Sequence, residues 1–420
     1  MVLVKYLHAI LLVIILVVAA HANLLIPMDE TQTDHLRAYG VAYKVLSMGE
    51  NVEWLLNYRG GSFMMSDSPQ WIAICQDFGV SYEAGVDPEP IYKTIEQNNM
   101  EVILLERAPK IAVYTPPIRD LDPWDDAVML TLDYARIPYD KLYDEEILAG
   151  KLAGYDWLHL HHEDFTGQLG KFWLSFRDAD WYLANVVFET AACQTSGFPS
   201  ISEHKKAVAR QIKRYVEDGG FMFAMCSATD TLDIALASEG IDIVDALYDG
   251  TPPDPGANSK LDYNKCLAFK NFELMTSPYI YEYSDIDTPR SLEGSPQDRY
   301  LTWSLFAFSA KADPIPTLLT QDHAAVLHEF MGQTTAFMED KIKSSVVVMG
   351  RMDGLPEVKY LYGSYGEGSF TFLAGHDPED FQHLVGDPPT DLSLFPHSPG
   401  YRLILNNILF PAARREDLKT

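Results

Sequence analysis

The stretch GGFMFAMCSATD, residues 219–230, indicates the fold class of this chain. Val208, Ile212 and Val216 precede it at spacings of four, so residues 205–216 are expected to form an amphipathic helix that ends at the two glycines. The five apolar residues FMFAM favour a fully buried strand, and the residues SATD after Cys are types that cap the start of a helix. A helix, a buried strand and a second helix in succession predict a layered α/β protein.

Extended and helical patterns alternate on both sides of this stretch. We expect strands at residues 23–27, 52–58, 62–65, 101–105, 111–114, 139–144, 156–161, 221–225, 358–362 and 369–373. We expect further helices at residues 35–47, 91–97, 125–135 and 401–410. The break at Ala108-Pro109 marks a domain boundary, which leaves a smaller N-terminal α/β domain over residues 23–107.

The composition is that of a folded, acidic protein. The chain has 420 residues, 47% of them hydrophobic, and 60 Asp and Glu against 32 Lys and Arg, which gives a formal net charge of −28. Binding to nucleic acid phosphates needs a surplus of basic groups, so nucleic acid is excluded as a partner and anionic lipid headgroups are disfavoured. We expect the ligand to be a small molecule, a saccharide or a peptide.

Residues 1–22 have the pattern of a secretory signal peptide. A lysine is followed by the apolar run AILLVIILVVAA and by the small-residue exit AHA. The apolar run is short for a bilayer span, and an uncleaved anchor is the alternative interpretation. We therefore expect a mature protein that begins at Asn23, is periplasmic or secreted, and keeps no stable membrane insertion after cleavage.

The mature chain would contain four cysteines, Cys75, Cys193, Cys226 and Cys266. Their even number permits disulfides after export. Four are too few for a disulfide scaffold, and they show no CxxC spacing. Buried free thiols are therefore an equally good interpretation for most of them.

Cys226 occupies the turn between the expected strand and the following helix, where several hydrolase folds place their nucleophile. The nearby Ala224 and Ala228 are small, as backbone crowding at such a turn requires. The free N–H groups at the helix start would favour a thiolate and could hold an oxyanion. The alternative is that Cys226 is a small apolar residue at the end of a buried strand.

A histidine with nearby carboxylates follows the expected strand at residues 369–373. The segment GHDPED places His376 just before Asp377 and Glu379. An imidazole and a carboxylate are what a general base and its orienting acid require. We therefore expect a Cys-His-acid constellation, with a purely structural histidine as the alternative.

Three motifs together resemble a known family. The segments GGFMFAMCSATD, YGEGSFTFLAGHDPED and RLILNNILFPA are similar to the class I glutamine amidotransferase-like superfamily, in particular to its trehalose-utilisation (ThuA-like) branch. The resemblance covers residues 108–412. It implies a three-layer, flavodoxin-like parallel sheet in a domain over residues 108–416, with an insertion at about residues 243–344.

The same resemblance implies roles for the site residues. Cys226 matches the nucleophile, His376 the base, and Glu379 or Asp377 the acid. The chain departs from the amidotransferase pattern, because alanines replace the glycines around Cys226 and Asp377 intervenes in the His-Pro-Glu motif. The expected chemistry is therefore hydrolysis or acyl transfer, without a firm expectation of glutaminase activity.

Over its whole length the chain also resembles a group of exported bacterial proteins that carry the label asparagine synthetase B. Its residues do not support that activity. The mature chain would begin Asn23-Leu24 and not with a nucleophilic cysteine, and the sequence has no SGGxDS-type ATP loop.

The segment WLHLHHED, beginning at Trp157, is a second chemical cluster. On a strand His159 and His161 point to the same face, and His162 follows at the carboxyl end, where open α/β sheets bind ligands. Imidazole and carboxylate groups suit zinc or another divalent metal. His159, His161 and His162 are therefore candidate metal ligands. Supplementary ligands could come from loops expected at the same sheet edge, namely Asp125, Asp126, Asp230 or His376.

If no metal binds, the same edge of the sheet forms a polar rim for the substrate. The residues expected in this rim are His161, His162, Glu163, Asp164, Asp230 and Asp126. The sequence thus supports three hypotheses: a cofactor-free hydrolase or acyl-transfer enzyme that uses Cys226, a metal-dependent hydrolase or isomerase, and a non-catalytic saccharide- or peptide-binding module.

Overall fold

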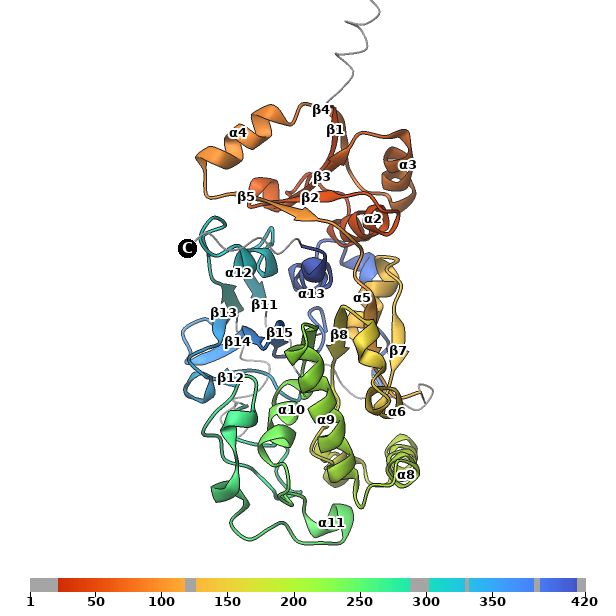
Figure 1. Cartoon of the computed structure of the whole chain (residues 1–420), viewed down its shortest axis with the longest axis vertical. Helices are drawn as coiled ribbons and strands as arrows, with labels where there is room; N and C mark the ends of the chain where they lie inside the picture. Colours follow the sequence, from red (N-terminus) through yellow and green to blue (C-terminus); the bar gives the residue numbers. More distant parts are fainter. Residues whose placement is uncertain (1–21, 118–125, 288–301, 329–331, 381–385, 414–420) are drawn as a thin grey trace, which may run out of the picture.

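The computed structural model describes residues 22–117, 126–287, 302–328, 332–380 and 386–413, which form a small sheet and a large sheet (Figure 1). The strands of the small sheet end at Leu105 and those of the large sheet begin at Ile111. The chain therefore passes from one sheet to the other at the expected break. The expected signal peptide, apart from its last residue, lies outside the described residues.

The small sheet has five strands, each antiparallel to its neighbours, in the order β4-β1-β3-β2-β5. They are β1 (Asn23–Ile26), β2 (Val52–Leu56), β3 (Ser62–Ser66), β4 (Glu83–Val86) and β5 (Glu101–Leu105). Successive side chains of a strand point to opposite faces. Leu24 and Ile26 accordingly share a core with α2 (His35–Ser47), whereas Leu25 packs with α4 (Glu89–Gln97) on the other face. A third helix, α3 (Pro69–Phe78), packs beside α2.

The large sheet is mixed, with ten strands in the order β11-β10-β13-β14-β15-β9-β8-β6-β7 and with β12 paired to β14. Its parallel part is β15 (Gly368–Leu373), β9 (Phe221–Met225), β8 (Trp157–Leu160), β6 (Ile111–Tyr114) and β7 (Asp140–Leu142). Its antiparallel part is β14 (Glu357–Tyr365), β13 (Val347–Met352), β10 (Thr302–Leu305), β11 (Val326–His328) and β12 (Phe337–Met338).

Helices cover both faces of the parallel part, because its central strands are apolar on both sides. Phe223 and Met225 of β9 face a core shared with α5 (Ala127–Tyr134) and α13 (Pro399–Leu409). Met222 and Ala224 face the opposite core, shared with α9 (Ile201–Glu217) and α10 (Ala228–Ala237). Shorter elements, α6 (Asp144–Leu148), α7 (Trp173–Phe176), α11 (Ala246–Asp249) and α12 (Pro314–Leu319), complete the described helices together with α8 (Asp180–Thr195).

The strongest sequence patterns match the observed elements. The expected helix at residues 35–47 and the expected strand at residues 221–225 have the predicted bounds. The expected strand at residues 139–144 is shorter, because Asp144 begins α6. The expected strand at residues 101–105 is only partly buried, since it lies at the edge of the small sheet and only Leu105 is fully covered.

The interpretation of SATD as capping residues is wrong in one detail. Ser227 stands at the N-cap of α10 with helical backbone angles, and its side chain makes no capping hydrogen bond. The expected strand therefore leads into the helix through Cys226 without a capped loop.

The expectation of buried free thiols is confirmed, because Cys75, Cys193, Cys226 and Cys266 are all buried and none forms a disulfide. Among the described residues, none of the helices combines the length and the apolar character that crossing a membrane requires.

Candidate functional site

The parallel strands bring the expected site residues to one edge of the large sheet. β15, β9, β8 and β6 run in the same direction, so the residues after their carboxyl ends lie near one another. His161 to Asp164 follow β8, Cys226 follows β9, and His376 follows β15. This arrangement joins segments that are more than 200 positions apart in the sequence.

Three histidines meet at this edge. The ring of His376 lies 4.1 Å from that of His161 and 5.6 Å from that of His162, measured between centroids. One nitrogen from each ring can be chosen so that all three nitrogens lie within 4.8 Å of one another. His161 and His376 are buried and His162 is half-buried. His376, which was expected as a supplementary ligand, thus joins the expected ligands His161 and His162, whereas His159 is not part of this set. Of the other supplementary ligands, Asp125 lies outside the described residues.

His159 belongs to a second buried group, which shares His161 with the three histidines described above (the histidine triad His161, His162 and His376). Asp126, His159 and His161 are buried together, with Asp126 Oδ1 3.4 Å from His161 Nδ1 and 3.6 Å from His159 Nε2. His159 Nδ1 lies 3.1 Å from the carbonyl oxygen of Phe223 and donates to it, because a carbonyl oxygen only accepts. His159 is thus held inside the protein between a carboxylate and the backbone of β9.

Asp126 is fixed by the start of a helix. It is the N-cap of α5, and its Oδ1 accepts from the backbone N–H groups of Val128 and Met129, each at 2.9 Å. The same oxygen faces His161 Nδ1. Asp126 therefore orients His161 so that its Nε2 can face the other two histidines. Burial lowers the pKa of His161 to about 4, against a partial opposing effect of Asp126.

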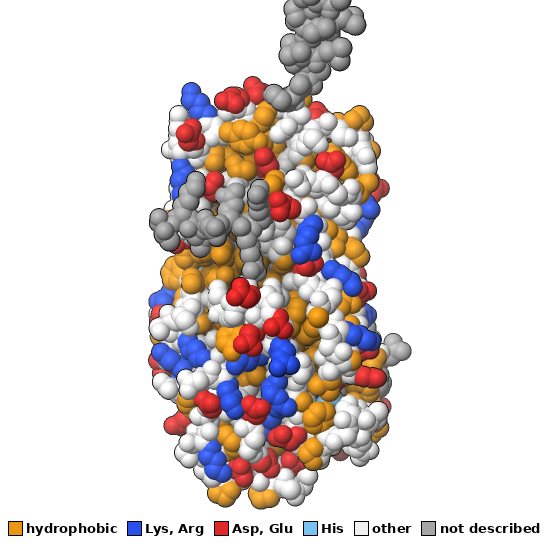
Figure 2. Space-filling view, viewed as in Figure 1, with side chains coloured by type: hydrophobic (Ala, Val, Ile, Leu, Met, Phe, Trp, Pro, Cys, Tyr) orange, Lys and Arg blue, Asp and Glu red, His pale blue; other side chains and the backbone are white. Residues whose placement is uncertain are grey.

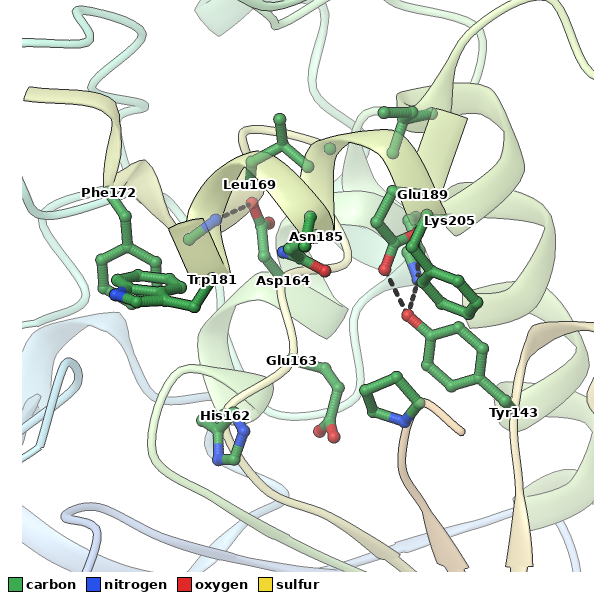
Figure 3. Close-up of a pocket in the computed structure, with 16 residues that line it drawn as sticks. Tyr143, His162, Glu163, Asp164, Leu169, Phe172, Trp181, Asn185, Glu189 and Lys205 are labelled. Atoms are coloured by element: carbon green, nitrogen blue, oxygen red, sulfur yellow. Dashed lines mark hydrogen bonds and ion pairs between the residues drawn. The ribbon is translucent and has the colours of Figure 1, made fainter. Parts of the chain in front are cut away.

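A cavity opens beside His162 (Figure 3). It contains about 860 Å³ of space outside the protein atoms, part of it open to solvent, and is lined by the loop after β8, by α8 and by the start of α9. Glu163 lies between His162 and Tyr143 in this view. Its Oε2 accepts from the backbone N–H of His161 at 2.8 Å, and burial raises the pKa of its carboxyl group.

Asp164 shapes the loop on one side of the cavity. Its Oδ1 accepts from the backbone N–H of Thr166 at 2.7 Å and its Oδ2 from that of Gly170 at 3.0 Å. These bonds hold the loop between β8 and α7 in a closed turn. Asp164 thus lines the cavity while both of its oxygens are engaged.

Cys226 has the strained backbone of an elbow but lacks access to the cavity. Its φ is +50°, a left-handed value that non-glycine residues seldom adopt, and its side chain is 2% exposed. Gly332 covers the sulfur so closely that a Cβ on this glycine would lie 3.1 Å from Cys226 Sγ. Cys226 is not among the residues that line the cavity, nor in either histidine group.

The expectation that the helix start favours a Cys226 thiolate is wrong. The sulfur does accept from the backbone N–H of Gln333 at 3.2 Å. Burial nevertheless raises the pKa of the thiol, against the opposing hydrogen bonds from Thr334, Gln333 and Ser227. The desolvation of a sealed sulfur outweighs the donors that surround it.

The two expected acids after His376 support the loop and α13. Asp377 Oδ2 accepts from the hydroxyl of Tyr401 at 2.6 Å, and Oδ1 accepts from the backbone N–H groups of Glu379 and Asp380. Burial raises the pKa of Glu379, against an opposing hydrogen bond with Ser398. These contacts fix the segment that carries His376 onto the start of α13.

Asp230 lies in the first turn of α10 and is fully buried. It accepts a hydrogen bond from the hydroxyl of Thr334 at 2.9 Å, and burial raises its pKa to about 7. It is absent from the residues that line the cavity. Asp230 therefore holds the 333–335 segment over Cys226 and does not form part of a substrate rim.

Sequence reasoning missed a buried ionic network at the far end of the cavity. Lys205 Nζ lies 2.8 Å from Asp144, 3.0 Å from Glu189 and 2.8 Å from the hydroxyl of Tyr143. Burial alone would lower the pKa of Lys205, but Asp144 and Glu189 outweigh it and raise the pKa. The sequence did contain an indication that Lys205 is buried, because Lys205 lies three residues before Val208, on the apolar face of its helix.

Comparisons with known proteins give no family for this chain. No family model matches it, and no curated protein matches it significantly. Two cytoplasmic proteins from Salmonella typhimurium each cover 73% of this chain over their full length, at 10% and 13% identity and a TM-score of 0.35. A beta-galactosidase from Bacillus circulans sp. alkalophilus covers 69% of this chain with 31% of its own length, at 11% identity and a TM-score of 0.27.

Proposed function

We propose that this protein is a metal-dependent hydrolase whose centre is formed by His161, His162 and His376. The observation that carries the proposal is the meeting of three imidazoles from two distant segments, with one nitrogen of each within 4.8 Å of the others. Three histidines with an open fourth position are a common ligand set of catalytic zinc. Zinc–nitrogen bonds of about 2.0 Å require ligand atoms about 3.3 Å apart, so small side-chain movements would complete the site.

The surroundings of the triad support a metal centre. Metal-binding histidines usually donate their second ring N–H to a carboxylate, which sets the tautomer and the ring orientation. Asp126 faces His161 Nδ1 at 3.4 Å in the matching arrangement. His161 Nε2 would then be the atom that binds the metal.

Glu163 supports hydrolysis because it lines the cavity next to His162. A bound zinc ion lowers the pKa of a water ligand and polarises a carbonyl oxygen. Glu163 would accept one proton from a water molecule as the water oxygen forms a bond with an acyl carbon of the substrate. The bond from that carbon to the leaving oxygen or nitrogen then breaks, and Glu163 returns the proton to the leaving group.

A fold proposal accompanies the proposed activity. We propose a flavodoxin-like, class I amidotransferase-like domain, in line with the sequence resemblance. In chain order the parallel strands are β6, β7, β8, β9 and β15, and their spatial order β7-β6-β8-β9-β15 corresponds to the flavodoxin-like order. The left-handed φ of Cys226 at the end of β9 agrees with the nucleophile position of that family.

That backbone strain also favours a second candidate function, acyl transfer or hydrolysis through Cys226 and His376. It would need the covering segment around Gly332 to move away from the sulfur. If this function is correct, Cys226→Ala abolishes activity while metal chelation has no effect. The metal-dependent function predicts the reverse.

Zinc titration tests the principal proposal. We expect isothermal titration calorimetry to show one zinc ion per chain, and the variants His161→Ala, His162→Ala and His376→Ala each to weaken binding by at least about 100-fold. His328→Ala, an exposed histidine on β11, is the matched control and should bind zinc normally. Equal zinc affinity in the wild type and in the three triad variants would overturn the proposal.

We also propose export, which rests on the residues of the signal pattern alone. N-terminal sequencing of the protein recovered outside the cytoplasm should begin at Asn23. Recovery of the full-length chain in the cytoplasm only would contradict this.

A further inference from the structure

The cavity beside the proposed metal centre carries information on the substrate. This inference rests on the proposed function, because it assumes that the bond cleaved lies at the three histidines. From His162 and Glu163 the cavity extends to Tyr143, Glu189 and Lys205 at its far end (Figure 3). Of the three histidines, His162 lines the cavity, so a substrate that fills it would place one end at His162 and the other against α8 and α9.

The charges on the cavity wall favour a cation. Three acidic residues line it, Glu163, Asp164 and Glu189, and among the described lining residues Lys205 is the only lysine or arginine. The ammonium group of Lys205 is already bound to Asp144 and Glu189. It is therefore not available to an anionic substrate, which would instead meet the carboxyl groups of Glu163 and Asp164 on the cavity wall.

The apolar part of the wall is aromatic. Phe172, Trp181 and Phe188 line the cavity. The Trp181 ring packs edge-on against Phe172, with the centroids 5.6 Å apart, and in a tilted arrangement against Phe176, with the centroids 5.2 Å apart. A fixed indole ring beside carboxylates is the combination that recognises alkylammonium groups, through cation–π attraction and charge.

We propose that the cavity binds the alkylammonium group of the substrate, and that the enzyme hydrolyses an ester or amide of an amine-bearing compound. The ammonium group lies against Trp181 and the acidic wall, and the acyl carbon lies at the three histidines. The net charge of −28 adds a long-range attraction for such cations.

Choline and its neutral carbon isostere, in which carbon replaces the quaternary nitrogen, form a matched pair of probes. We expect calorimetry to show that choline binds at least about tenfold more tightly than the isostere. The measurement is made on the full protein, both after chelator treatment and after zinc loading. Tighter binding of choline than of the isostere, in either form of the protein, supports the inference. Equal affinity for choline and the isostere in both forms would overturn it. Methyl glucoside serves as a saccharide probe, and tighter binding of this compound than of choline would also overturn the inference.

Two variants of α8 locate the binding. Trp181→Ala and Ala184→Lys each change the cavity wall and should weaken choline binding by about tenfold or more. Leu183→Ala lies between them on the same helix with its side chain 49% exposed, and it should leave binding unchanged. Unchanged choline binding in both wall variants would overturn the inference.

Zinc binding and choline binding are measured separately, so this inference and the proposed function can fail independently. Loss of zinc binding in the triad variants does not depend on choline, and choline binding to chelator-treated protein does not depend on zinc. A protein that binds zinc but not choline retains the function with another substrate. A protein that binds choline but not zinc retains the cation-binding cavity without the metal.

Discussion

Asp126 connects the proposed metal centre with the helix that follows the first parallel strand. Its Oδ1 both caps α5 and faces His161. A single carboxylate thus couples the ring orientation of a metal ligand to helix formation. The two roles can be separated by substitution, because asparagine also caps helices well but has no charge.

We expect Asp126→Asn to fold normally and to weaken zinc affinity by about 10- to 100-fold, the usual effect of removing a carboxylate that orients a ligand. Calorimetric zinc titration measures this. Asp133→Asn, at an exposed position on the same helix, is the control and should bind zinc like the wild type. Unchanged affinity in Asp126→Asn would show that Asp126 does not orient His161.

Cys226 gives a second prediction at this scale. Because the sulfur is 2% exposed and burial raises the pKa of its thiol, we expect native protein to react slowly with a thiol reagent at neutral pH. Because none of the four cysteines forms a disulfide, all four should react rapidly once the protein is unfolded in denaturant, even when no reducing agent is added. Rapid labelling of Cys226 in the native protein would instead support the thiol-based function.

The sequence predicted the position of a site residue correctly where that residue directly follows a parallel strand. His161, His162 and His376 could be placed at one edge because parallel strands share a direction. The partners of individual side chains could not be predicted, since Gly332 and Thr334 come from a segment distant from Cys226 and Asp230. Because of these tertiary contacts, Cys226, the expected nucleophile, and Asp230, an expected rim residue, are buried.

At the scale of elements, one buried carboxylate joins α10 to the segment 267–269. Asp233 accepts from the backbone N–H groups of Leu267, Ala268 and Phe269 at 2.6, 2.8 and 2.8 Å. Burial raises its pKa against these hydrogen bonds. The loop that crosses the end of α10 therefore depends on this side chain for three of its backbone donors.

We expect Asp233→Ala to lower the free energy of unfolding by about 3 kcal/mol, because buried N–H groups lose their acceptor. Urea denaturation followed by circular dichroism measures this. Asp218→Ala, at the exposed end of α9, should change stability by less than about 0.5 kcal/mol. A loss of similar size in both variants would contradict the assigned role.

Elements with a clear period were predictable and the others were not. α2 and β9 have strong apolar patterns, and their bounds were predicted. α8 was not predicted, because its apolar residues surround the helix and Leu183 and Val187 remain exposed. β10 and β11 were not predicted because they are only four and three residues long. β13 was not predicted either, and its pairing with β14 has register shifts around Gly350.

At the scale of the whole molecule, histidines from three distant segments pack together at α2, the helix that covers the small sheet. His35 Nε2 donates to the carbonyl oxygen of Met28 at 3.0 Å, so its Nδ1 accepts from His397 Nδ1 at 2.9 Å. The ring of His323 stacks on His35 at 4.3 Å, and Arg402 contacts His323. Burial, followed by the charge of Arg402 and the neighbouring histidines, lowers the pKa of His35 to about 3.

This junction predicts a loss of stability in acid. The folded pKa of His35 lies below its ordinary value of 6.5, so between these values the unfolded chain binds the proton and the folded chain does not. The stabilisation is complete above the ordinary value and falls as the pH drops toward about 3, by at most about 5 kcal/mol. Urea denaturation at about pH 7 and about pH 5 measures the loss, and His35→Gln should reduce it. The same loss in the variant would contradict the assignment.

On the visible face of the molecule (Figure 2), the surface charge is distributed and not concentrated in one patch. On the face shown in Figure 2, basic and acidic side chains of the described residues lie interleaved. The pair of Arg210 with Glu239, which also binds Lys265, illustrates this pattern. Composition alone predicted the acidic excess, but the position of the acidic cavity required the fold.

A crystal structure of the zinc-loaded protein, with anomalous scattering measured at the zinc edge, tests whether His161, His162 and His376 bind one metal ion. We expect one strong anomalous peak within bonding distance of a nitrogen of each of His161, His162 and His376. A zinc peak elsewhere, or the same three imidazoles without a peak at saturating zinc, would contradict it.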